Sequence, residues 1–147
     1  MGRFLKLVVI AAIVFLAIQI VPYGRDHDNP RTVRELSWSS PATRALAVDG
    51  CFDCHSNLTE WPWYTSIAPV SWLTQHDVED GRAKLNFSEW QRPQDADLQD
   101  VVDAIRHGGM PPRQYRALHS KARLTDAQRQ QLERGLTASW VKDPPGR

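Results

Sequence analysis

The chain has 147 residues, which is room for one domain and a short appendage. Its formal net charge is +1, and the 16 basic and 17 acidic residues from Gly24 onward nearly cancel. This balance argues against a nucleic-acid surface, which requires a clustered basic excess. The ten prolines predict many fixed turns and short helices.

Residues 1–23 predict a segment that targets the chain to a membrane. Arg3 and Lys6 supply the positive charge, and Phe4 to Tyr23 gives twenty mostly apolar residues, enough to span a bilayer. The two interpretations are a membrane anchor and a cleaved signal sequence. We favour an uncleaved transmembrane helix, because residues 19–23 offer no small-x-small cleavage site. A single-pass protein of the bacterial inner membrane would then carry its C-terminal domain in the periplasm.

Three segments are predicted after this helix. Residues 24–30 are polar and form a tether, residues 31–142 form the folded domain, and residues 143–147 form a frayed tail. The domain's first predicted helix begins with Ser40 as N-cap and Pro41 at the first helical position. It continues into the segment that contains both cysteines of the chain.

Those cysteines belong to a C-x-x-C-H run formed by Cys51, Phe52, Asp53, Cys54 and His55. This spacing is that of a c-type haem attachment site. Sulfurs three residues apart lie on one side of a helical turn, where both can form thioethers with the haem vinyl groups. The histidine that follows becomes the proximal iron ligand. The sequence therefore predicts one covalent haem c on Cys51, Cys54 and His55.

Three alternatives to haem attachment remain open at this point. A thioredoxin-like redox motif would need a βαβ context, and the sequence has no convincing strand. A zinc site would need four ligands, and no second C-x-x-C or H-x-x-x-H pair supplies them. A structural disulfide across a two-residue gap would close a very small loop and stabilise little.

An aromatic run follows the motif, and we expect Trp61, Trp63 and Tyr64 to contact the cofactor or to form ordinary core. A further helix is predicted over Val70 to Leu85. The clearest helix is Asp95 to His107, whose apolar residues recur at i, i+3, i+4 and i+7. Two glycines end it.

Met110 lies directly after these glycines and before two prolines. Glycines let the backbone approach a flat macrocycle, and prolines hold the sulfur in place. We therefore predict Met110 as the sixth iron ligand, so that His55 and Met110 are the two metal ligands. The alternative ligands are His76, His107 and His119. The alternative role for Met110 is to fill a gap in the hydrophobic core.

The last helix is predicted to start at Thr125, which forms a capping box with Gln128. The fold class that follows is all-α: a small cytochrome c-like helical domain with long loops around one haem, preceded by the transmembrane helix.

Several runs together resemble the small bacterial haem-binding-domain proteins related to cytochrome c. The matching runs are Cys-Phe-Asp-Cys-His-Ser-Asn at 51–57, Trp-Pro-Trp-Tyr at 61–64, Ile-Ala-Pro-Val-Ser-Trp-Leu at 67–73, Gly-Arg at 81–82, Leu-Asn-Phe-Ser-Glu-Trp at 85–90, and Gly-Gly-Met-Pro-Pro at 108–112 with Tyr115. The resemblance covers about half of the chain. It implies one covalently bound haem on Cys51, Cys54 and His55, with Met110 as distal ligand by the cytochrome c pattern.

These expectations define a membrane-anchored monohaem c-type cytochrome that transfers single electrons, more an electron carrier than an enzyme. Its redox partner protein is left unspecified by the residues. The alternative is a haem-based peroxidase or a gas or redox sensor in which the distal ligand moves away. A weaker third hypothesis is a thiol oxidoreductase without haem.

Overall fold

The computed structural model describes residues 2–146, in which the regular elements are helical and the β contacts amount to an isolated bridge between Arg34 and Glu89. The all-α prediction is confirmed. The elements are α1 (Gly2–Ile18), α2 (Pro41–Gly50), α3 (Phe52–His55), η1 (Trp63–Ser66), α4 (Val70–Lys84), α5 (Leu98–Arg106), α6 (Arg113–Leu118), η2 (Ser120–Ala122) and α7 (Asp126–Lys142).

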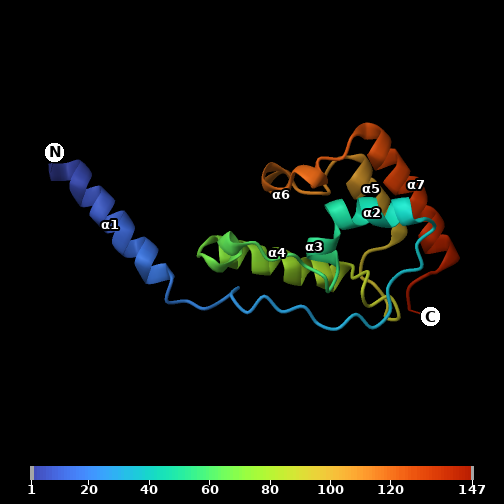
Figure 1. Ribbon diagram of the computed structural model, residues 1–147, viewed down its shortest axis with the longest axis horizontal. Helices are drawn as coiled ribbons and strands as arrows, with labels where there is room; N and C mark the ends of the chain where they lie inside the picture. The colour runs from blue at the N-terminus through green and yellow to red at the C-terminus, as the bar shows by residue number, and fades with distance from the viewer. Residues whose placement is uncertain (1, 147) are drawn as a thin grey trace. The chain divides into compact units, whose positions relative to one another are not determined.

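The chain divides into two compact units. The first contains the residues up to Asp28 together with Glu60–Asp77, and the second contains Asn29–Thr59 together with the residues from Val78 onward. Helix α4 begins in the first unit and ends in the second, and it confirms the helix predicted over residues 70–85. Figure 1 labels the helices α1 to α7 along the chain.

Helix α1 is shorter than the predicted transmembrane helix. It ends at Ile18 after 17 residues, and the side-chain amide of Gln19 donates to Phe15 O at 3.1 Å and to Ala68 O at 2.8 Å. Arg25 Nη2 also donates to Gln19 O at 2.7 Å. These bonds hold a turn where the apolar run was expected to stay helical. Across residues 2–146, helices both long and apolar enough to cross a membrane are absent, so the predicted transmembrane helix is wrong.

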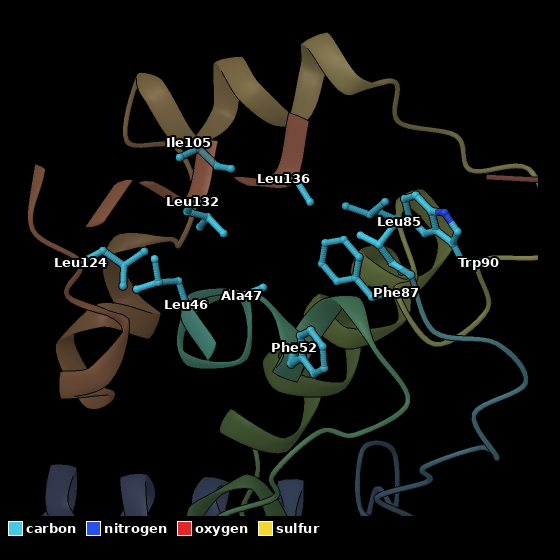
Figure 2. Packing of buried hydrophobic residues seen from close by; sticks show 11 residues of the cluster. Leu46, Ala47, Phe52, Leu85, Phe87, Trp90, Ile105, Leu124, Leu132 and Leu136 are labelled. Atoms are coloured by element: carbon cyan, nitrogen blue, oxygen red, sulfur yellow. The ribbon is translucent and has the colours of Figure 1, made fainter. Parts of the chain in front are cut away.

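The second unit has its core among α2, α5 and α7, which lie close together in Figure 1. Figure 2 shows the apolar side chains of this core facing one another. They are buried residues from the four helices α2, α3, α5 and α7 and from the segments that flank them: Leu36, Leu46, Ala47, Phe52, Leu85, Phe87, Trp90, Ile105, Leu124, Leu132 and Leu136. Phe52 belongs both to this core and to the predicted haem motif, since it lies between the two cysteines.

The helix starts predicted from capping residues are confirmed. Ser40 caps α2 by accepting a hydrogen bond from the backbone N–H of Thr43, with Pro41 in the first turn. Thr125 and Gln128 form the predicted capping box of α7, each side chain accepting from the other residue's backbone N–H. Both caps satisfy backbone donors that a helix start leaves open.

The remaining helices of the second unit differ from expectation at their ends. Helix α5 begins at Leu98 and not at Asp95, because Asp97 is the N-cap and accepts from Asp100 N at 2.9 Å. Helix α6 was not predicted. It follows Pro112, has no side-chain cap and buries no residue, so it carries neither of the usual sequence signals.

Asp143, where the predicted tail begins, is held by three residues. Its carboxylate accepts from Arg34 Nη1 at 2.9 Å and from the backbone N–H of Ser37 at 2.9 Å. Its backbone carbonyl accepts from Trp90 Nε1 at 2.6 Å. These contacts fasten the end of α7 to the first residues of the same unit.

Candidate functional site

The C-x-x-C-H run lies where α2 ends and α3 begins. Cys51 is the C-cap of α2, and its backbone N–H donates to Ala47 O at 2.8 Å. Phe52 then enters the core and stacks on Phe87, with ring centroids 5.8 Å apart. The buried ring fixes the four-residue helix α3, which is too short to be stable alone.

Neither cysteine of the run is in a disulfide, and both are partly buried. Burial, and next the charge of Cys54, raise the pKa of Cys51 to about 12. The Cys51 thiol is therefore protonated near neutral pH. A thiol–disulfide oxidoreductase needs a thiolate with a lowered pKa, so this site is poorly suited to the haem-free oxidoreductase hypothesis.

His55 is oriented by two backbone carbonyls. Its Nδ1 lies 3.0 Å from Gly81 O and 3.1 Å from Leu85 O. Because carbonyl oxygens only accept, Nδ1 carries the hydrogen and Nε2 keeps its lone pair. Burial lowers the pKa of His55 below its ordinary value of 6.5, which favours the neutral imidazole. A neutral ring fixed through Nδ1 is the form that binds a metal through Nε2.

Gly81 allows the last turns of α4 to lie against the motif. A Cβ atom at this position would lie 2.3 Å from Cys54 O, which is far inside contact distance. Any larger residue would push the Gly81 carbonyl away from His55. Sequence reasoning missed this role, although the Gly-Arg pair at 81–82 is one of the runs that carry the resemblance.

The segment that follows the motif is also fixed by polar contacts. Arg82 Nε donates to Ser56 O at 2.8 Å, and its Nη2 donates to Thr59 Oγ1 at 2.9 Å. The buried side chains of Asn57 and Asn86 bond to each other at 2.8 Å. These contacts, between residues 23 to 29 positions apart, hold the end of α3 rigidly beside the end of α4.

The Met110 loop has contacts that bring its flanks to the motif. Met110 N donates to Ala104 O at 3.0 Å. A Cβ placed on Gly50 would lie 3.1 Å from Pro111 Cγ, so Pro111 packs beside the residue that precedes Cys51. The Met110 side chain itself is 40% exposed. The assignment of its sulfur as an iron ligand stays a prediction.

The competing histidines have other contacts. His107 Nδ1 lies 2.9 Å from Asp103 O at the end of α5, and His119 Nδ1 lies 3.0 Å from Tyr115 O. His76 lies in the part of α4 that belongs to the first unit. Two of the three thus have backbone partners of the kind expected for a histidine with a local structural role.

Tyr115 is a second residue that sequence reasoning did not single out for the site. Its hydroxyl donates to Asp53 Oδ2 at 2.6 Å, and Asp53 lies between the two cysteines. Burial, and next the bond to Asp53, raise the pKa of Tyr115, so the phenol stays a donor. The partners are 62 positions apart in the sequence, which explains why no local pattern predicts the contact.

The predicted aromatic contacts Trp61, Trp63 and Tyr64 belong to the first unit. Trp61 stacks on His27 with ring centroids 4.6 Å apart. Trp63 is 77% exposed and meets Tyr64 edge-on at 6.0 Å. Their role toward a cofactor stays a prediction.

The fold and the site define a small helical protein with two cysteines outside any disulfide and one oriented neutral imidazole, a donor set that fits a haem attached through sulfur. Residues 13–138 match the haem-binding domain family, and because this is most of the chain, the protein belongs to that family. A haem is therefore its cofactor.

The chain is also similar to the cytochrome c peroxidase Ccp of Escherichia coli (strain K12), with 24% identity over 136 residues. The alignment covers 84% of this chain and 29% of that protein, so the chain spans less than a third of this relative's length. No solved structure matches the chain.

Proposed function

We propose that the protein is a monohaem c-type cytochrome that carries single electrons. The observation that carries this proposal is the orientation of His55, whose Nδ1–H bonds to Gly81 O and Leu85 O leave Nε2 for iron. When bound, haem supplies exchange between ferrous and ferric iron, which moves one electron. The chain's own part is to hold, orient and partly bury that group.

Attachment is proposed through both cysteines. Each thiol S–H adds across one vinyl double bond, so a C–S bond forms, the hydrogen moves to the neighbouring carbon, and no atom is lost. Reduced thiols are the reactant that this addition needs, and neither Cys51 nor Cys54 is in a disulfide. We propose the periplasm as the location of the haem domain, because c-type haem is attached on that side of the bacterial membrane.

The test is the mass and the spectrum of protein made with the haem c assembly machinery. The intact mass should exceed that of the bare chain by one whole haem, and acid acetone should not extract the colour. The Cys51→Ala/Cys54→Ala variant is the matched control and should yield colour that acid acetone removes. A wild-type mass equal to the polypeptide would contradict covalent attachment.

A second candidate is a haem peroxidase or a gas or redox sensor. It is favoured by the similarity to a cytochrome c peroxidase, of which the chain spans 29%. Carbon monoxide distinguishes the two functions. An electron carrier with a firmly bound sixth ligand should bind carbon monoxide slowly or not at all in the ferrous state, whereas an enzyme or sensor should bind it readily.

A further inference from the structure

A hydrogen bond between two side chains joins the haem motif to the helix that follows the Met110 loop. Tyr115 Oη donates to Asp53 Oδ2 at 2.6 Å. Asp53 is placed between Cys51 and Cys54, and Tyr115 is five residues beyond Met110. The bond therefore links the segment that contains one predicted iron ligand, His55, to the segment that contains the other, Met110.

The Tyr115 hydroxyl has a fixed position, because the ring itself is held. The ring is half-buried and stacks on the ring of His119, with centroids 3.9 Å apart and planes 12° apart. His119 Nδ1 donates back to Tyr115 O at 3.0 Å. The Tyr115 side chain therefore loses little additional conformational freedom when its hydroxyl bonds to Asp53.

Helix α6 depends on such contacts for its placement. It has six residues, no side-chain cap and no buried residue, and a helix of this length is unstable by itself. Upstream, the loop is held by the bond from Met110 N to Ala104 O and by the packing of Pro111 beside Gly50. Downstream, the bond from Tyr115 to Asp53 supplies the matching fixed point.

We propose that Tyr115 is a positioning residue that fastens α6 to the C-x-x-C-H run and so keeps the Met110 sulfur at the sixth iron position. This inference rests on the proposed function, in which Met110 is that ligand. Met110 itself is held through its backbone, by the bond from its N–H to Ala104 O at 3.0 Å. The time it spends at the iron is then set by how firmly both ends of its loop are held.

The test uses the full haem-loaded chain and the Tyr115→Phe variant, which keeps the ring and its stack on His119 and removes only the donor. Three readouts are the weak red-edge absorption band of sulfur-ligated ferric haem, the rate of carbon monoxide binding, and amide hydrogen exchange over residues 113–118. Tyr23→Phe is the matched control, a hydroxyl removed from a tyrosine of the first unit.

We expect Tyr115→Phe to weaken the band and to speed carbon monoxide binding and exchange on the order of tenfold, the size of one lost hydrogen bond to a charged group. Adding Asp53→Ala should change these readouts little further, because the two residues act through one bond. Tyr23→Phe should match the wild type.

The outcomes separate this inference from the proposed ligation. A wild-type protein with the band and a Tyr115→Phe variant with equal band, equal carbon monoxide rate and a lower unfolding temperature would overturn the positioning role and leave Met110 as ligand. A wild-type protein without the band would overturn Met110 ligation, and the positioning role with it.

Discussion

At the scale of single residues, the site depends on backbone groups as much as on side chains. The haem-binding role of the pentapeptide was predicted from the sequence, because its functional residues are consecutive and form a known motif. The partners of His55 were not, because they are carbonyls 26 and 30 residues away that carry no side-chain signal. The role of Gly81 was missed as well, although a missing side chain is itself visible in the sequence.

Gly81→Ala should reduce both stability and haem loading. The added Cβ would meet Cys54 O, a backbone atom that cannot rotate away, and should cost about 1–3 kcal/mol even though alanine favours a helix. Urea unfolding and the haem-to-protein ratio measure the two effects. Gly2→Ala is the matched control, because Gly2 is also helical and a Cβ there would meet nothing within 4 Å. Equal stability of both variants would contradict the close approach.

Met110→Ala should remove the red-edge band, lower the reduction potential and let carbon monoxide bind ferrous protein, because a thioether favours ferrous iron and blocks the sixth position. Met110→His should restore six ligands at a lower potential. His76→Ala and His107→Ala are the controls and should keep the band. If one of them opens the iron and Met110→Ala does not, the haem has two histidine ligands.

At the scale of helices, α2 and α7 pack closely because α7 has a glycine at the point of contact. A Cβ on Gly135 would lie 2.1 Å from the Oγ1 of Thr43, which is buried and bonded to Ser40 Oγ. Ser39 Oγ also donates to Gly135 O at 2.8 Å across the same contact. This close packing places α2, and therefore the cysteines at its end, against the core.

Gly135→Ala should lower the free energy of unfolding by about 1–3 kcal/mol, because buried atoms must move to admit the new methyl group. Adding Thr43→Ala should recover part of this loss, since it removes two of the three atoms that the methyl group meets. Thermal unfolding of the two single variants and the double variant gives the coupling between them. Strictly additive losses would show that the helices do not touch here.

Helices with their own caps or apolar period were predicted well from the sequence, and elements that depend on distant contacts were not. α2 and α7 start at the residues that cap them. α6 has neither cap nor apolar face. The transmembrane prediction failed for a similar reason: composition indicates an apolar run, but α1 ends where Gln19 bonds to Ala68, 49 residues away.

At the scale of the whole second unit, its two ends are joined through Asp143. Burial opposes ionisation, but the bonds from the backbone N–H of Ser37 and from Arg34 outweigh it and lower the pKa of Asp143 below its ordinary value of 3.8. A carboxylate with a lowered folded pKa stabilises the protein above its unfolded pKa. That contribution is lost as the pH falls below 3.8 toward the folded pKa.

Asp143→Asn should therefore cost roughly 1–3 kcal/mol at pH 7 and less at pH 3, where the wild type has begun to lose the same interaction. Guanidinium unfolding at the two pH values measures the difference. Asp126→Asn is the control, since its pair with Arg129 is exposed on the Asp126 side and should contribute under about 1 kcal/mol. A loss at Asp143 that does not change with pH would contradict a charged role.

The bonds from His55 to Gly81 and Leu85 also decide how much of the chain a working haem site needs. A peptide of residues 41–59 would keep both thiols and the histidine, yet it would lack the carbonyls that set the imidazole tautomer. Transplanting the pentapeptide into another helix would move the two thiols and the histidine and leave behind the carbonyls that orient the histidine. The transferable unit is the pentapeptide together with the turn of α4 that receives it.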